Sequence, residues 1–308
     1  MDRRRRFRFT LAMIVVFGVV FLFPTSLGLA QISAIGTGGF PLLLEDISDI
    51  PESMAQSAEQ LAAELFGDYP EKGVDFTDQL LATYEQAKDR DVVIFFNSGG
   101  WGWNLADASP GWFSILSGIQ VELRNLGCET LVLNYQRTED NLIGRVDEFM
   151  SMISLYPNKA KDLALQVGFL TRHVPGLKVI LAGESDGTII CDMAMSILKD
   201  NDRVFSIQTG PPFWHKQRAT ERSLVLTNSG LGPDVFAQGD LFAMLAASLE
   251  DFFGFPRDRA SPGNIMYYIG APGHDYHWCY PGVYPEIINF LNHNFKLNSK
   301  INNFKEVS

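Results

Sequence analysis

The stretch VILAGESDGTIICDMAM, residues 179–195, places Ser185 between Gly183 and Gly187 at the end of an apolar run. The pattern G-x-S-x-G is typical of a nucleophile elbow, in which a tight turn between a strand and a helix exposes the serine hydroxyl. Glycines are needed there because a side chain at either position would collide with the neighbouring strand or helix. An ordinary Gly-Ser connection has the same letters, so the pattern indicates a nucleophile only if other groups converge on Ser185.

A glycine-rich loop follows an earlier apolar run in DVVIFFNSGGWGW, residues 91–103. Acyl transfer needs two backbone N–H groups that converge on one developing oxyanion. The N–H of Asp186, directly after the serine, is expected to supply one of them, and that of Gly99 or Gly100 the other, with Trp101 as a further candidate. The competing interpretation is an ordinary flexible glycine loop.

The general base is expected in MYYIGAPGHDYHWCYPGVYPEIINFL, residues 266–291. His274 directly follows a Pro-Gly pair after a predicted strand, which favours it over His277, although the loop could wind either way. The other three of the five histidines lie on predicted helices or lack a glycine turn before them. They are therefore weaker candidates.

Asp234, in LVLTNSGLGPDVF after the penultimate predicted strand, is expected to orient that imidazole. The chain order serine, aspartate, histidine then follows the order of the predicted strands. Asp240 is the reserve for this role. The alternative interpretation of Asp234 is a simple turn cap beside Pro233, since aspartate often caps turns.

His274, His277 and Cys279 form the pattern H-x-x-H-x-C, a spacing that can bind zinc. A structural zinc site needs a fourth ligand, and no paired motif nearby supplies one, so we expect no metal. The sequence also contains neither a phosphate-binding glycine loop nor a dinucleotide fingerprint. We therefore expect no organic cofactor.

These residues require a scaffold that brings the ends of several strands to one edge. Short apolar runs without alternation suit strands buried on both faces of a parallel sheet, and here they alternate with helical patterns. The predicted strands are residues 92–96, 130–135, 179–181, 204–208, 224–227 and 265–269. The predicted helices are residues 51–66, 77–87, 113–126, 159–173, 188–199, 241–253 and a last helix opened by Pro285. The alternation predicts an α/β fold with a doubly wound, mostly parallel sheet flanked by helices.

Residues 1–30 indicate an export signal or a membrane anchor. Five arginines precede an apolar stretch, residues 11–23, and Gly28-Leu29-Ala30 is typical of a cleavage site. No charge interrupts residues 9–44, so an uncleaved anchor, with membrane association through residues 9–30, is an equally good interpretation. Either one places the rest of the chain outside the cytoplasm.

The rest of the chain divides into a linker with N-terminal helices, residues 31–90, that packs on a main domain, residues 91–308. The 308 residues are 46% hydrophobic, which is enough for a sizeable core. Residues 1–30 carry a net charge of +4, so residues 31–308 carry −15 of the total of −11. So acidic a body argues against nucleic acid as a partner. Three cysteines permit at most one disulfide, and Cys191 is expected to be a small buried hydrophobe.

The elbow, the glycine loop, the acid and the base together resemble the α/β-hydrolase superfamily over about residues 91–297. Asn97-Ser98 stands where that family often has His-Gly, which leaves the choice of oxyanion amide open. The resemblance implies a serine esterase or lipase-like hydrolase that works through an acyl-enzyme, although peptidase or acyltransferase chemistry would use the same residues. The alternative is a catalytically silent domain of this fold that acts as a membrane-tethered binding or assembly protein.

Four tryptophans, Trp101, Trp103, Trp214 and Trp278, are assigned to the sheet edge that carries the serine. Large aromatic side chains there would line an apolar pocket, or they would seal the loops over the core. The pocket interpretation favours a small-molecule ester or lipid-like substrate with an apolar acyl or aromatic part.

Overall fold

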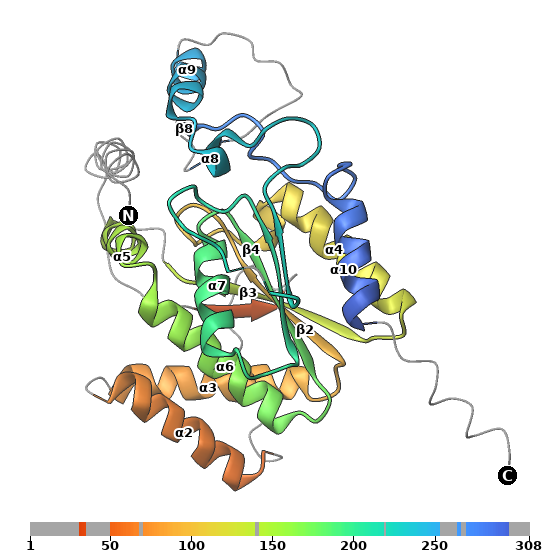
Figure 1. The fold of residues 1–308 in the computed structure, drawn as a ribbon. Helices are drawn as coiled ribbons and strands as arrows, with labels where there is room; N and C mark the ends of the chain where they lie inside the picture. Colours follow the sequence, from red (N-terminus) through yellow and green to blue (C-terminus); the bar gives the residue numbers. More distant parts are fainter. Residues whose placement is uncertain are drawn as a thin grey trace, which may run out of the picture.

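The computed structural model describes residues 31–34, 50–67, 70–138, 142–218, 220–252, 264–265 and 269–295. These residues form an α/β fold in which helices flank a mostly parallel sheet (Figure 1). The export signal or anchor predicted for residues 1–30 lies outside them. Every helix in the described ranges is too short or too polar to span a membrane.

The main sheet has six strands in the order β1-β3-β2-β4-β5-β6. Strands β2 to β6 are parallel to their neighbours, and β1 pairs antiparallel with β3 at one edge. The bounds are β1 Gln31–Ala34, β2 Val92–Asn97, β3 Thr130–Gln136, β4 Lys178–Glu184, β5 Val204–Thr209 and β6 Ser223–Leu226. The five predicted strands between residues 92 and 227 are thereby confirmed. Strand β1 falls where the sequence predicts a linker, because four residues are too few to show a period.

The central strands are buried on both faces, as their unbroken apolar runs predict. Val92, Ile94 and Phe96 of β2 belong to one core cluster, whereas Val93 and Phe95 belong to another on the opposite face. Side chains alternate along a strand, so one apolar run fills two cores and both faces of the sheet need a cover of helices.

Helices provide this cover on both faces (Figure 1). One core cluster lies under α4 (Pro110–Asn125) and α10 (Tyr284–Phe295). The other lies under α2 (Glu52–Phe66), α3 (Pro70–Ala87), α5 (Leu142–Ile153), α6 (Pro157–His173) and α7 (Gly187–Ile197). The further described helices are the short 3-10 helix η1 (Ala106–Ala108), α8 (Val235–Gln238) and α9 (Leu241–Phe252).

Two of the longer helices differ most from the sequence-based prediction. The helix predicted to open at Thr77 begins at Pro70, and the Thr77 hydroxyl instead donates to the Gly73 carbonyl at 2.9 Å within α3. Threonine suits both uses, because its hydroxyl bonds nearby backbone either as a cap or inside a helix. Helix α5 is not predicted at all. Its exposed face carries apolar side chains such as Val146 and Met150, which obscures the amphipathic pattern.

The prediction of a sixth strand at residues 265–269 is wrong. Asn264–Ile265 (β7) and Ile269–Gly270 (β8) pair antiparallel with each other, apart from the main sheet. Strand β8 packs against α9, beyond the end of the sheet where α8 also lies (Figure 1). A short apolar run in the sequence does not distinguish one continuous strand from two short strands that fold back on each other. The segment that carries His274 therefore reaches the site from outside the sheet.

Candidate active site

Ser185 lies on a sharp turn between β4 and α7. Its φ of 49° is in the left-handed region, which costs a residue with a side chain roughly 1–2 kcal/mol. The Ser185 N–H donates to the carbonyl of Thr209 at 3.0 Å, which ties the turn to the end of β5. The side chain is buried, and its Oγ has no hydrogen-bond partner among the described residues. The chain thus holds an unpartnered hydroxyl on a strained turn.

Glycines give this turn its room. A Cβ at Gly187 would lie 2.3 Å from the carbonyl oxygen of Asn97, so only glycine fits there. A Cβ at Gly183 would lie 3.0 Å from the Cα of the second residue of α7. The loop after β2 is equally close, because a Cβ at Gly99 would lie 2.9 Å from the Cβ of Ser185. The structure therefore brings the predicted elbow and the predicted glycine loop into contact.

The structure also pairs His274 with Asp234. The Nδ1 atom of His274 lies 3.0 Å from Oδ2 of Asp234. An ionised carboxylate only accepts hydrogen bonds, so Nδ1 carries the proton and Nε2 is left as an acceptor. The hydroxyl of Tyr276 donates to the same Oδ2 at 2.7 Å, while Oδ1 accepts the N–H groups of Phe236 and Ala237. Asp234 thus caps α8 and holds the imidazole at the same time.

His274 lies beside the elbow. Gly210, which directly follows β5, has a φ of 59°, and a Cβ there would lie 2.5 Å from Cε1 of His274. The residue before it, Thr209, is the one that accepts the N–H of Ser185. No direct hydrogen bond joins Ser185 to His274 within the described residues. The base and the nucleophile therefore share one strand end but are not hydrogen-bonded to each other in this state.

Asp186, the residue directly after the serine, has a buried side chain at the N-terminus of α7. Burial raises the pKa of this carboxyl to about 7, against the opposing charges of Arg137 and His274. Its Oδ1 has no hydrogen-bond partner among the described residues. Its backbone N–H also has none, so that N–H remains available to a ligand.

The N–H of Gly99, one of the predicted oxyanion donors, is already engaged. It donates to Oε2 of Glu184 at 3.1 Å, and burial raises the pKa of that carboxyl. The N–H groups of Gly100 and Trp101 have no partner among the residues that the structure describes. In this state, the loop therefore offers the donors of Gly100 and Trp101 rather than that of Gly99.

Sequence reasoning missed the side chain that holds this loop. Arg137, directly after β3, is fully buried, and its guanidinium donates to the carbonyls of Ser98 and Gly100. Its Nε donates to Oε1 of Glu148 at 2.6 Å. No local motif marks Arg137, because its partners lie 39, 37 and 11 residues away along the chain.

Three of the tryptophans assigned to the site pack at its margin. Trp101 and Trp103 stack with their ring centroids 5.8 Å apart. Trp214 packs edge-on against Phe236 at 5.4 Å, and Phe236 in turn lies 4.8 Å from the ring of His274. An aromatic wall therefore adjoins the base, and its use as a substrate pocket stays a prediction.

Trp278 packs elsewhere. A Cβ at Gly118 in α4 would lie 2.2 Å from the Trp278 ring, and the ring of Tyr284 lies 5.2 Å away. Its backbone N–H is also engaged, since it donates to the hydroxyl of Ser114 at 3.0 Å. These contacts place it over the core between α4 and α10, as in the interpretation that tryptophans seal the core.

His277, the alternative base, and the cysteines lie in surroundings that differ from those of His274. Nε2 of His277 lies 3.5 Å from Oδ1 of Asp275, and both side chains are partly exposed. Cys128, Cys191 and Cys279 are free cysteines, and Cys191 is buried in the core, as predicted. Among the described residues, no three His, Cys, Asp or Glu side chains are grouped so that they could hold a metal ion.

A second buried histidine pair lies along α7. Nε2 of His215 is 2.9 Å from Oδ2 of Asp192, and the other carboxylate oxygen accepts the N–H of Arg218 at 3.1 Å. The sequence disfavours His215 as a base because no glycine turn precedes it. The pair provides a matched control for experiments on His274.

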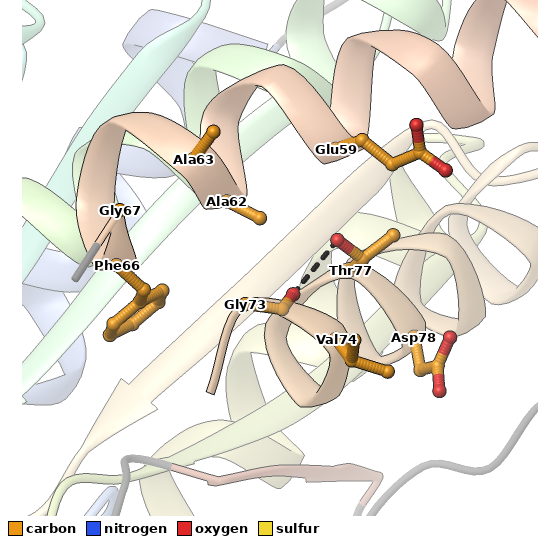
Figure 2. A pocket seen from close by; sticks show the side chains of 9 residues that line it. All are labelled: Glu59, Ala62, Ala63, Phe66, Gly67, Gly73, Val74, Thr77 and Asp78. Atoms are coloured by element: carbon orange, nitrogen blue, oxygen red, sulfur yellow. Dashed lines mark hydrogen bonds between the residues drawn. The ribbon is translucent and has the colours of Figure 1, made fainter. Parts of the chain in front are cut away.

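A cavity of about 410 Å³ lies between α2 and α3 (Figure 2). It is at the end of the molecule opposite to α8 and α9 (Figure 1). Its lining residues are Glu59, Ala62, Ala63, Phe66, Gly67, Gly73, Val74, Thr77 and Asp78. None of the residues predicted for the site is among them.

Comparison with known proteins identifies no family. No protein-family model matches the chain, and no curated protein is similar to it in sequence. Among solved structures, a Trichoderma reesei cutinase in complex with a phosphonate inhibitor is similar, with 14% sequence identity and a TM-score of 0.34. The match covers 63% of this chain and 81% of the cutinase chain.

Proposed function

We propose that this protein is a serine hydrolase that cleaves a carboxylic ester through an acyl-enzyme on Ser185. The observation that carries the proposal is the buried hydrogen bond between His274 and Asp234 beside a strained serine turn. Acyl transfer needs a nucleophile, a base at the same strand end and a carboxylate that orients the base.

In the proposed reaction, Nε2 of His274 takes the proton of the Ser185 hydroxyl as Oγ attacks the ester carbonyl. Asp234 keeps the other ring nitrogen protonated and stabilises the imidazolium that forms. The imidazolium then gives its proton to the departing alcohol, and water repeats the sequence to release the acid. The N–H of Asp186, at the start of α7, and an N–H of the glycine loop bind the developing oxyanion.

The proposed substrate is a small-molecule or lipid-like ester with an apolar part. Trp214 and Phe236 form an apolar wall next to His274, which suits an acyl chain or an aromatic ring better than a charged group. We further propose that the protein acts outside the cytoplasm, secreted or anchored through residues 9–30. The reaction needs neither a metal nor an organic cofactor, because the proposed groups supply the nucleophile, the base and the donors.

The test is to treat the purified full-length chain with a fluorophosphonate probe and with short acyl esters. We expect the wild-type protein to be labelled on Ser185 and to turn over the esters, and the Ser185→Ala variant to do neither. His215→Gln serves as the control, because it disturbs a buried histidine pair that makes no hydrogen bond to the Ser185 hydroxyl. A folded wild-type protein that the probe does not label would overturn the proposal.

A second candidate is a catalytically silent domain that serves as a membrane-tethered binding or assembly protein. The observation that favours it is that the Ser185 hydroxyl makes no hydrogen bond to His274. The same experiment distinguishes the two candidates, because a silent domain would show equal, negligible labelling of the wild-type protein and of Ser185→Ala.

A further inference from the structure

The charged guanidinium of Arg137 is buried beside the glycine loop. Its side chain has no exposed surface, and a buried charge is costly unless its donors are paired. Glu148 accepts from Nε, whereas the two terminal nitrogens donate to the carbonyls of Ser98 and Gly100. Both terminal nitrogens of the planar fork therefore donate to the glycine loop. The delocalised guanidinium is better suited to this paired contact than a lysine ammonium.

These two carbonyl contacts also set the direction of two N–H groups. The chain has no cis peptide in its described part, and in a trans peptide the C=O and the N–H point in opposite directions. The Ser98 carbonyl faces Arg137, so the Gly99 N–H points away from it, and that N–H indeed donates to Glu184. By the same geometry, the Gly100 carbonyl turns the N–H of Trp101 away from Arg137.

The loop also wraps tightly around the Arg137 stem. The Arg137 N–H donates to the carbonyl of Gly102 at 3.1 Å, and a Cβ at Gly102 would lie 2.5 Å from the arginine Nε. The Gly102 N–H donates back to the carbonyl of Gly99 at 3.3 Å, which closes a four-residue turn. The Arg137 side chain therefore supports residues 98–102.

A buried network holds the guanidinium in turn. Oε1 of Glu148 accepts from Arg137 and from the Tyr156 hydroxyl at 2.9 Å. Oε2 accepts from the Thr138 hydroxyl at 2.7 Å and from Nζ of Lys159 at 2.8 Å. Each carboxylate oxygen thus has two donors, so Glu148 fixes the plane of the arginine fork.

We infer that Arg137 is a positioning residue for oxyanion binding: its guanidinium orients the Gly100–Trp101 peptide so that the Trp101 N–H is presented as a donor. The inference rests on the proposed hydrolase function and names the side chain that makes the second donor available. Gly99 touches the Ser185 side chain, which puts this loop directly beside the reacting hydroxyl.

The experiment compares three variants of the full-length chain in the hydrolysis of a short-chain p-nitrophenyl ester. Arg137→Lys keeps the charge opposite Glu148 but loses the fork. Arg137→Met/Glu148→Gln removes both buried charges together, so it leaves no unpaired ion, and Lys159 keeps Asp147 at 3.1 Å. Arg203→Lys is the control, because that guanidinium also donates to two backbone carbonyls, both outside the glycine loop.

We expect kcat to fall by about 10²-fold in Arg137→Met/Glu148→Gln, with KM changed by less than about threefold, because a lost oxyanion donor acts only in the transition state. Arg137→Lys should lose about tenfold, since an ammonium lacks the rigid planar fork that aligns the two carbonyls. Arg203→Lys should keep kcat within about twofold of the wild type, because the loop contacts of Arg137 remain. The rate of fluorophosphonate labelling should follow kcat in all three.

Two outcomes are distinguishable failures. If the wild-type Ser185 is labelled but the folded Arg137 variants keep the wild-type kcat, or lose no more than Arg203→Lys, the inference about Arg137 is wrong and the hydrolase proposal stands. If the folded wild-type protein is not labelled at all, the proposed function fails, and the inference fails with it. Circular dichroism melts establish which variants are folded, and the double variant decides the matter if Arg137→Lys does not fold.

Discussion

Oδ2 of Asp234 lies 3.0 Å from Nδ1 of His274, and neither side chain exposes more than 7% of its surface. The second oxygen of the same carboxylate is held by two backbone N–H groups at the start of α8. The carboxylate therefore cannot turn away from the imidazole without uncapping that helix. One buried aspartate thus couples the position of His274 to the local fold.

Replacing Asp234 with asparagine should leave the fold in place and remove most of the activity. The amide oxygen of asparagine can still cap α8, but its NH2 group would face Nδ1 of His274 and favour the wrong tautomer. We expect kcat for ester hydrolysis to fall by on the order of 10³–10⁴-fold. Asp192→Asn, in the other buried histidine pair, should lower kcat by less than about tenfold if it acts only through stability. Equal losses in both variants would contradict the assignment of Asp234.

Tyr276→Phe should cost stability more than activity. The hydroxyl donates to Oδ2 of Asp234 at 2.7 Å, and a hydrogen bond to a buried charged group contributes about 1.5–3 kcal/mol. We expect the free energy of unfolding in urea to fall by that amount and kcat to fall by no more than about tenfold, because His274 still has its partner. Tyr280→Phe is the control, since its hydroxyl bonds the partly exposed Asp275 at 3.2 Å. A loss of 0.5 kcal/mol or less in Tyr276→Phe would show that this hydroxyl does not stabilise the carboxylate.

Patterns that are local in sequence predict much of the fold. Strand β4, the turn at Ser185 and helix α7 form one continuous stretch, so their spacing is visible in the letters. The buried strands are likewise visible as apolar runs, because a strand covered on both faces has no polar side. Chain order alone also places Asp234 and His274 as candidates, although the strand expected before His274 folds back as a separate pair instead of joining the sheet.

Contacts between distant segments could not be predicted in this way. Arg137 reaches the glycine loop, Glu184 engages the Gly99 N–H, and Gly210 lies against His274, each across a separation that no periodic pattern records. A buried arginine and a solvated one have the same letter in a sequence. Gly210 has a signal, a glycine two residues after a predicted strand, but the imidazole that requires it arrives from a segment 64 residues later.

Gly187→Ala should prevent the elbow from forming. The added methyl carbon would lie 2.3 Å from the carbonyl oxygen of Asn97, which is backbone at the end of a central strand and cannot move aside. We expect a loss of about 3 kcal/mol or more in the free energy of unfolding, or insoluble protein. Gly168→Ala in α6 is the matched control, because its added carbon would lie 3.8 Å from the Leu198 side chain and alanine favours a helix by up to about 1 kcal/mol. A Gly187→Ala protein with wild-type stability would mean that the turn is not as close as described.

Asp186→Asn should change how stability depends on pH. Burial raises the pKa of Asp186 from 3.8 to about 7, so between these values the folded chain holds a proton that the unfolded chain has released. Stability from this group is fully present below pH 4 and is lost as pH rises through 7, at up to about 1.4 kcal/mol per pH unit. Asparagine cannot ionise, so the variant should gain stability relative to the wild type as pH rises from 4 to 7. Urea unfolding at pH 4.5, 6 and 7.5 measures this difference, and a constant difference across the three pH values would contradict the raised pKa.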